Sequence, residues 1–140
     1  EGSPVLSWPL DPSNNRITAL FNDPDYPFRN LFEHSGLDIA APVGSEVRSP
    51  APGYVAWTRV GRLYGNYMMV IHQGGVATLY AHLSSFEAAA DQFIPRGGVI
   101  ARTGGCRGCP GAGLSTGPHL HFEVRKNGIP TNPLQYVIKP

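Results

Sequence analysis

Residues 115–124 read STGPHLHFEV and place two histidines one position apart in a segment with the pattern of a β-strand. Side chains alternate between the two faces of a strand, so His119, His121 and Glu123 share one face. Phe122 and its apolar neighbours take the other face and are expected to cover a hydrophobic core. Histidines on the polar face of a strand are often ordinary surface residues, so this pair does not define a site without further residues.

The segments on both sides of this stretch predict more strands. Short apolar runs are separated by glycine, proline and asparagine, which are typical of turns. The predicted strands are residues 16–21, 36–41, 45–50, 53–61, 66–72, 75–83, 98–104, 119–128 and 132–138. The one predicted helix covers residues 84–94, with Ser84 or Ser85 as its cap and Pro95 just beyond its end. The pattern therefore predicts an all-β, mainly antiparallel domain with at most one or two short helices.

Length and composition limit the possible classes of protein. The chain has 140 residues, which fits a single domain over residues 1–140 with residues 1–15 as an irregular N-terminal segment. The 17 glycines and 14 prolines favour short strands and turns over helices. A net charge of +1 gives no basic patch for nucleic acid. No apolar run is long enough to span a membrane, and no signal peptide opens the chain.

TLYAHL, residues 78–83, places another histidine in a predicted strand. Alternation predicts that Thr78, Tyr80 and His82 face the same way. Two roles are open for Tyr80, contact with a substrate or packing in the partly buried strand. His72, in MMVIHQGG, belongs to no comparable motif, and we expect it to end a strand beside a turn.

HSGLDIAAP, residues 34–42, contains a histidine and an aspartate four positions apart with a glycine between them. A neutral imidazole and an ionised carboxylate are good zinc ligands, and a further imidazole would complete a catalytic set of three. Such a set leaves the metal Lewis acidic. The alternative is that Asp38 only stabilises a turn by accepting backbone hydrogen bonds.

Together, HSGLDIAAP, TLYAHL and STGPHLHFEV resemble the motifs of the LytM/lysostaphin-type zinc metallopeptidases, in the same order. This family cleaves peptide bonds in bacterial cell-wall peptidoglycan. The resemblance covers about residues 17–137 and implies the family's fold, an antiparallel β domain related to the duplicated hybrid motif.

The resemblance also implies a role for each site residue. His34, Asp38 and His121 are expected to bind one zinc ion per domain. His82 and His119 are expected to be catalytic histidines that do not bind the metal. The chain has no His-Glu-x-x-His helix, the motif whose glutamate is the general base in many zinc peptidases. A histidine can replace that base, because its ordinary pKa of about 6.5 suits proton transfer near neutral pH. The sequence does not divide the proton transfers between His82 and His119.

Two further features bear on the mechanism and the substrate. Glu33 and Glu123 are rival general bases, one beside a predicted ligand and one two positions beyond His121. Many members of the family have a Phe-Gly-x-Arg turn after the first strand, where this chain reads FNDPDYPFRN. Arg29 is the candidate for the positive group of that turn.

Cys106 and Cys109 are the only cysteines and lie in GGCRGCPGAGL, residues 104–114, an apparent insertion before the last histidine motif. Two cysteines cannot form a zinc ribbon, and no βαβ context suggests a thioredoxin-like motif. The pair is interpreted as a local disulfide that shapes a glycine-rich loop, with two free thiols as the alternative. A disulfide would fit an oxidising location outside the cytoplasm.

These residues predict a zinc-dependent endopeptidase that hydrolyses peptidoglycan cross-links or stem peptides by means of a metal-activated water. We expect it to act outside the cytoplasm as a monomer, within a longer exported protein, with bacterial peptidoglycan peptides as its partners. An alternative is a catalytically inactive relative that binds peptidoglycan or activates another hydrolase. A phosphocarrier domain, which shares a related β architecture, is a third interpretation, although it needs no carboxylate ligand.

Overall fold

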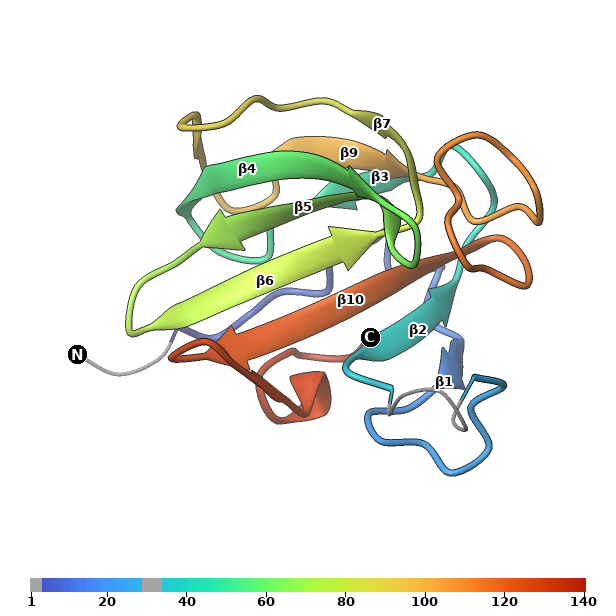
Figure 1. Ribbon diagram of the computed structural model, residues 1–140. Helices are drawn as coiled ribbons and strands as arrows, with labels where there is room; N and C mark the ends of the chain where they lie inside the picture. The colour runs from blue at the N-terminus through green and yellow to red at the C-terminus, as the bar shows by residue number, and fades with distance from the viewer. Residues whose placement is uncertain (1–3, 29–33) are drawn as a thin grey trace.

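The computed structural model describes residues 4–28 and 34–140, and antiparallel strands dominate that part of the chain (Figure 1). The larger sheet has the order β1 (Ile17–Ala19), β2 (Leu37–Ala40), β10 (His119–Lys126), β6 (Val76–Ala81), β5 (Gly65–Ile71), β4 (Gly53–Gly61) and β8 (Phe93–Ile94), with β11 (Ile129–Thr131) also paired to β10. A smaller sheet has the order β3 (Glu46–Arg48), β9 (Val99–Thr103) and β7 (Leu83–Phe86). In the described residues the helical element is the short 3-10 helix η1 (Pro133–Gln135). The predicted all-β class is confirmed.

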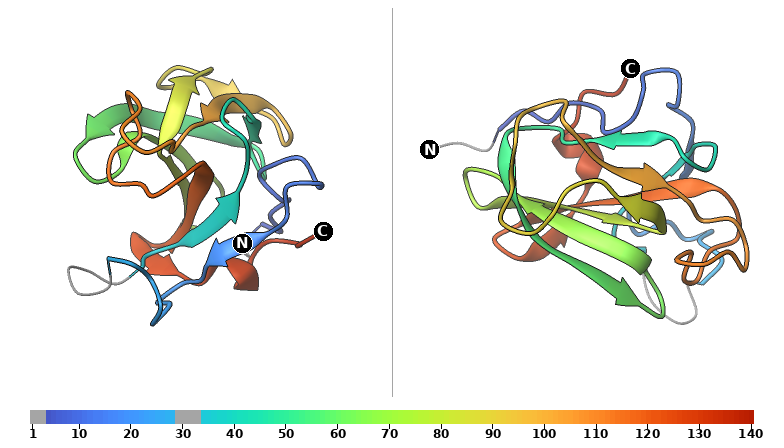
Figure 2. Two further views of the ribbon diagram at one scale, coloured as in Figure 1. Left: turned by 90° about the vertical axis from the view of Figure 1, so that its right-hand side faces the viewer. Right: turned by 90° about the horizontal axis from the view of Figure 1, so that it is seen from above.

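The smaller sheet lies beside the β4 end of the larger sheet (Figures 1 and 2). Side chains from both sheets join one hydrophobic core. The core includes Val47, Val55, Met68, Val70, Tyr80, Leu83, Ile100, Leu120, Phe122 and Val124. The N-terminal segment has no named strand or helix in its described part, but Leu6, Trp8 and Leu10 are buried in the same core.

Strand β10 lies between β2 and β6 in the larger sheet, and its two faces differ as alternation predicts. Leu120, Phe122 and Val124 are fully buried in the core. Burying one apolar side chain of this size contributes about 1.5–3 kcal/mol, so a slip of one residue in this strand would be costly. His119 and His121 are consequently held on the opposite face of β10.

The prediction that Thr78, Tyr80 and His82 share one polar face is wrong. Tyr80 lies opposite Phe122 in the pairing of β6 with β10, so both rings point into the core, and Thr78 and Tyr80 are fully buried. The Tyr80 and Thr78 hydroxyls are hydrogen-bonded to each other, which satisfies both groups away from water. Tyr80 therefore has the packing role, one of the two roles that its sequence context leaves open.

His72 follows the last residue of β5 at the turn into β6, as expected, and its backbone N–H donates to the Val76 carbonyl. Its Nδ1 lies 2.9 Å from the Pro52 carbonyl oxygen and its Nε2 lies 2.8 Å from Thr78 Oγ1. Because a carbonyl only accepts, Nδ1 carries the proton. Burial lowers the pKa of His72, so this core histidine is held neutral.

The predicted helix over residues 84–94 is wrong. Residues Leu83–Phe86 form β7 and pair with β9, and Phe93–Ile94 forms β8 and pairs with β4. Between them, the Asp91 N–H donates to the Val55 carbonyl, and Asp91 adopts a φ of 69°, outside the helical region. Hydrogen-bond partners on two sheets thus outweigh the helix propensity of the three alanines in this segment.

The predicted strand over residues 132–138 is also wrong. Residues Pro133–Gln135 form η1, and the Asn132 side chain accepts a hydrogen bond from the Leu134 N–H at its start. Proline has no N–H to give to a sheet, and its φ suits the first turn of a helix, so Pro133 favours this geometry. Val137 forms only an isolated bridge with Leu6.

Candidate active site

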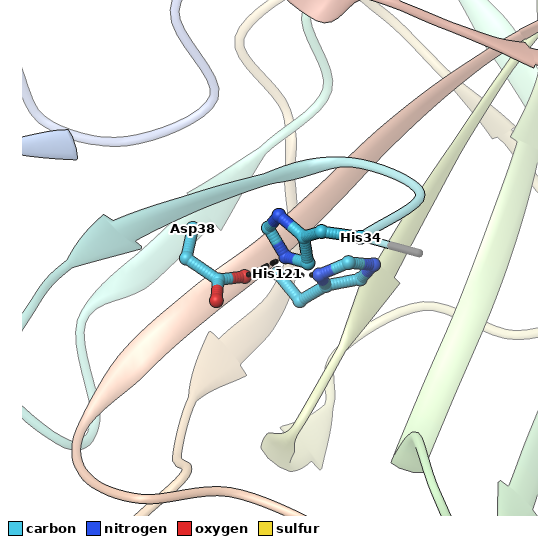
Figure 3. Close-up of side chains that lie close together, drawn as sticks. All are labelled: His34, Asp38 and His121. Atoms are coloured by element: carbon cyan, nitrogen blue, oxygen red, sulfur yellow. Dashed lines mark hydrogen bonds and ion pairs between the residues drawn. The ribbon is translucent and has the colours of Figure 1, made fainter. Parts of the chain in front are cut away.

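Asp38 and His121 lie directly opposite each other on the paired strands β2 and β10. His121 Nδ1 is 2.9 Å from Asp38 Oδ1, and His34 Nε2 is 3.1 Å from the same oxygen. Figure 3 shows the three side chains converging, with His34 on the segment that leads into β2. All three residues are buried, and one donor atom from each lies within 4.8 Å of the others. The structure thus brings together the three predicted ligands.

The bend between His34 and Asp38 depends on Gly36. A Cβ atom at this position would lie 2.5 Å from the Phe122 carbonyl oxygen, closer than real contacts allow. Glycine therefore lets the segment pass against the backbone of β10. This close approach places His34 beside His121.

The hydrogen bonds of His34 assign its ring nitrogens. Nδ1 lies 2.7 Å from the Leu20 carbonyl oxygen, which only accepts, so Nδ1 carries the proton and Nε2 has the lone pair. Nε2 is fully buried, and although it lies near Asp38 Oδ1, no hydrogen bond of acceptable geometry reaches it. A buried lone pair without a donor is a position that a metal ion satisfies.

Glu123 holds His121 from the side opposite to Asp38. His121 Nε2 lies 2.8 Å from Glu123 Oε2, which also accepts hydrogen bonds from Ser35 Oγ at 2.6 Å and from the Tyr64 hydroxyl. The other carboxylate oxygen, Oε1, accepts two hydrogen bonds from the Arg125 guanidinium at 2.9 and 2.7 Å. Both oxygens of this fully buried carboxylate are therefore engaged, which fits a role in orienting His121 rather than the rival role of general base.

The two carboxylates make the site favourable for a positive charge. Burial alone lowers the pKa of His121, but its hydrogen bonds to Asp38 and Glu123 outweigh burial and raise the pKa to about 9. Burial raises the pKa of Asp38 and of Glu123, yet hydrogen bonds from His121 hold both below their usual range. In the absence of metal, a proton on His121 compensates two buried anions. Two imidazoles and a carboxylate are a donor set that suits zinc, which could take over that charge.

His82 reaches the site through an unusual backbone conformation. It lies between β6 and β7 with a φ of 61°, and its backbone N–H donates to the Tyr64 carbonyl. This left-handed residue interrupts the alternation of the strand, so the His82 ring leaves the core face. Its Nδ1 donates to the Ala112 carbonyl at 2.5 Å, which leaves the Nε2 lone pair free. Burial, with the neighbouring histidines His119 and His121, lowers the pKa of His82 to about 4.

His119 lies at the start of β10, and its ring centroid is 5.0 Å from that of His82. Its Nδ1 lies 2.7 Å from the Gly117 carbonyl oxygen, so Nε2 is again the nitrogen without the proton. His119 Nε2 lies 3.6 Å from Asp38 Oδ1. The structure thus places both predicted catalytic histidines next to the candidate metal ligands, each with its Nδ1 fixed by a backbone carbonyl.

A cavity of about 700 Å³ opens beside His34, His82 and His121. Three tyrosines and two leucines give this cavity apolar walls. Among the described residues that line it, Arg62 is the one with a permanently charged side chain. The lining residues are Tyr26, His34, Ser35, Gly61, Arg62, Leu63, Tyr64, Tyr67, His82, Leu114 and His121. Tyr26 stacks on His34 with ring centroids 4.2 Å apart.

The structure adds residues that sequence reasoning did not find. Tyr64 lies in a predicted turn and Ser35 lies inside the HSGLD motif, and no local pattern indicates that both contact Glu123. Cys106 and Cys109 form the predicted disulfide. The candidate base Glu33 and the candidate positive group Arg29 lie outside the described residues.

A buried His-Asp-His cluster with two further histidines beside it, on an antiparallel β-sheet, defines a candidate metallohydrolase centre. Residues 32–133 match the family described as Peptidase family M23. The chain belongs to this family, which confirms the resemblance to LytM and lysostaphin that the motifs carry.

Similar proteins agree with this family. The chain is 41% identical over 124 residues to the DD-carboxypeptidase/endopeptidase Mpg of Neisseria meningitidis, a match that covers 88% of this chain and 27% of Mpg. It resembles the crystal structure of a zinc-containing peptidase from Vibrio cholerae with a TM-score of 0.80 and 32% identity, covering 91% of this chain and 39% of that one. The catalytic domain of lysostaphin from Staphylococcus simulans has a TM-score of 0.75 at 23% identity, covering 89% of this chain and 93% of that one, and supports the fold alone.

The chain thus spans little more than a quarter of the length of Mpg. Among the described residues, no helix has the length and the apolar character needed to cross a membrane.

Proposed function

We propose that this chain is a zinc-dependent endopeptidase that hydrolyses peptide bonds in peptidoglycan cross-links or stem peptides. The observation that carries the proposal is the convergence of His34, Asp38 and His121 on one point, with His82 and His119 beside it. Relatives with peptidase names in the same family support this proposal, and the name of Mpg favours a bond of the DD class.

The proposed ligands are His34 through Nε2, Asp38 through its carboxylate and His121 through Nδ1. Hydrogen bonds at the opposite nitrogens favour this assignment, since His34 Nδ1 bonds to the Leu20 carbonyl and His121 Nε2 to Glu123. Orienting partners of this kind are typical of metal-binding histidines. When bound, one zinc ion per domain supplies Lewis acidity, which polarises a peptide carbonyl and makes water more acidic.

His82 and His119 are proposed to move the protons of the reaction. Hydrolysis adds water across the amide, so one proton must leave the water and one must reach the departing amine. The Nε2 of each ring can accept a proton in the neutral form and return it afterwards, because Nδ1 of each ring is held on a carbonyl. The low pKa of His82 keeps its ring neutral before reaction at neutral pH.

The cavity fits a short peptide. Its volume of about 700 Å³ lies in the usual range of ligand sites, and its tyrosines and leucines provide apolar walls for small side chains. Arg62 adds a positive charge that suits a free carboxylate on a stem peptide. Peptidoglycan peptides are therefore the proposed substrate and partner.

An extracytoplasmic location is part of the proposal. Disulfides persist in oxidising compartments, and Cys106 and Cys109 are paired. Peptidoglycan also lies outside the cytoplasm. Both arguments support a protein that acts at the cell wall.

The test is release of soluble fragments from purified peptidoglycan, followed by mass analysis that identifies the cleaved bond. We expect native protein to release fragments, chelator-treated protein to release none until zinc is restored, and His119→Ala to release almost none while it keeps its metal. Arg107→Ala is the control, because the Arg107 side chain is exposed and the change leaves the proposed ligands and both catalytic histidines in place. Binding of peptidoglycan without cleavage by zinc-loaded protein would instead support the non-catalytic alternative.

A further inference from the structure

The disulfide loop, residues 104–114, folds back on itself in successive turns. Cys106 and Cys109 are covalently joined, and the Cys109 N–H donates to the Cys106 carbonyl at 3.0 Å. The Ala112 N–H then donates to the Cys109 carbonyl at 3.1 Å. The position of Ala112 therefore depends on the turn that the disulfide closes.

The end of the disulfide loop is seated on the hairpin between β4 and β5, where Figure 2 shows the two segments together in its left view. The Asn66 N–H donates to the Gly111 carbonyl at 2.8 Å, and the Leu114 N–H donates to the Leu63 carbonyl at 2.9 Å. A Cβ atom at Gly65 would lie 2.1 Å from the Gly111 carbonyl oxygen. The two backbones touch, so the hairpin fixes the loop on both sides of Ala112.

The carbonyl of Ala112 in turn accepts the hydrogen bond from His82 Nδ1–H, at 2.5 Å. Ala112 is buried, which leaves this carbonyl away from bulk water. The backbone N–H of His82 donates to the Tyr64 carbonyl on the same hairpin. Loop and hairpin together therefore determine which nitrogen of His82 faces the cavity.

We propose that the disulfide loop is a positioning element that holds His82 in the Nδ1–H tautomer, with the Nε2 lone pair turned to the site, and that opening the disulfide releases this constraint. The proposal rests on the catalytic role of His82 in the proposed function. A dithiol reductant opens the bond by exchange: the dithiol loses two electrons and two protons and becomes a cyclic disulfide, while Cys106 and Cys109 become thiols. Activity is thereby coupled to an oxidising environment.

The first experiment measures the tautomers directly, by NMR of 15N-labelled imidazoles in metal-free protein. In native protein we expect His82 and His72 both as the Nδ1–H form, because each donates to a backbone carbonyl. Treatment with a dithiol should convert His82 to a mixture of tautomers and leave His72 unchanged. Since no metal is present, chelation by the dithiol does not affect this readout.

The second experiment uses Cys106→Ser/Cys109→Ser, with Arg107→Ala as the control that keeps the disulfide. A wrongly protonated or misoriented histidine loses only part of its contribution, so we expect kcat to fall about tenfold, less than the about 10²–10⁴-fold that general acid–base catalysis typically provides. KM and zinc content should be unchanged, because the proposed ligands lie on β10, on β2 and on the segment that leads into β2.

Three results would overturn the proposal. One is a His82 tautomer that does not change when the disulfide is opened. Another is loss of the native signals of both His72 and His82 after dithiol treatment, which would mean that the disulfide supports the whole fold. The third is a double serine variant with native kcat. If native protein itself cleaves no peptidoglycan, the proposed function fails, while the tautomer measurement still tests the positioning role.

Discussion

Asp38 and His121 are neighbours across a strand pair, whereas His82 occupies a break between two strands. The first pair is held by the ladder of β2 and β10, with the core face of β10 fully buried behind it. His82 depends on two backbone carbonyls from different loops and on a left-handed φ. The comparison teaches that the spacing of Asp38 and His121 is fixed by strand pairing, while the position of His82 is fixed by two loops. Sites on strands are generally positioned more accurately than sites on loops.

The largest expected effect comes from changing Asp38, the proposed ligand on β2. Asp38→Asn keeps the shape of the side chain but removes the negative charge that pairs with His121 and with a bound cation. Loss of a residue that only supports a ligand typically lowers metal affinity by about 10–100-fold, and we expect a larger fall in zinc affinity for this proposed ligand. We also expect no detectable hydrolysis of peptidoglycan. Zinc titration and fragment release measure both. Asp91→Asn is the control, since Asp91 is exposed and asparagine tolerates its left-handed φ.

Removing either of the two proposed proton-transfer histidines should separate catalysis from metal binding. His82→Ala and His119→Ala are each expected to lower kcat by about 10²–10⁴-fold, the range for loss of a general acid or base. Each variant should still bind one zinc ion, because neither residue is a proposed ligand. Loss of zinc together with activity in either variant would contradict the proposed division between metal ligands and proton-transfer residues.

A third change tests the support behind His121. Glu123→Gln places an amide N–H₂ either toward the Arg125 guanidinium or toward the donors Ser35 and Tyr64, so some hydrogen bonds are lost whichever way it turns. We expect zinc affinity to fall by about 10–100-fold and activity to recover at excess zinc.

Glu46→Gln is the control for this change, because Glu46 pairs with Arg48 on the surface and contacts no site residue. Unchanged zinc affinity in Glu123→Gln would show that the carboxylate does not support the site. Failure of excess zinc to restore activity would instead point to a direct catalytic role.

The smallest expected effect concerns His72, which shares the Nδ1–carbonyl arrangement of His82 but lies in the core. Its pKa is lowered by burial, so at acidic pH the unfolded chain binds a proton that the folded protein does not. Its contribution to stability is present above the unfolded pKa of about 6.5 and is lost as pH falls toward the folded pKa, at up to about 1.4 kcal/mol per pH unit. Denaturant unfolding of metal-free protein should show a shallower pH dependence below pH 6.5 for His72→Gln than for native protein. Equal slopes would contradict this prediction.

Much of the site could be predicted from short motifs. The alternation of HLHFEV separates the core residues from the histidines of β10, and the four-residue spacing of HSGLD places a carboxylate and an imidazole on one bend. Both patterns are local, because successive side chains of a strand alternate between its two faces whatever the rest of the fold is. The disulfide is local as well, because its cysteines are three positions apart.

Other features depend on contacts between distant segments. Residues 84–94 have the composition of a helix, and pairing with β9 and β4 made them strands and turns. The face of Tyr80 was decided by its pairing with β10, and the direction of His82 by a φ that no motif indicates.

The sequence by itself determined the class of fold, the family and the residues that the candidate metal site brings together. Only the tertiary structure decided how these residues are held: Glu123 engaged by Ser35, Tyr64 and Arg125, and His82 oriented by the carbonyl of Ala112. The physical reason is that residue type and alternation act over a few positions. Hydrogen-bond partners and burial, in contrast, join segments far apart in the chain.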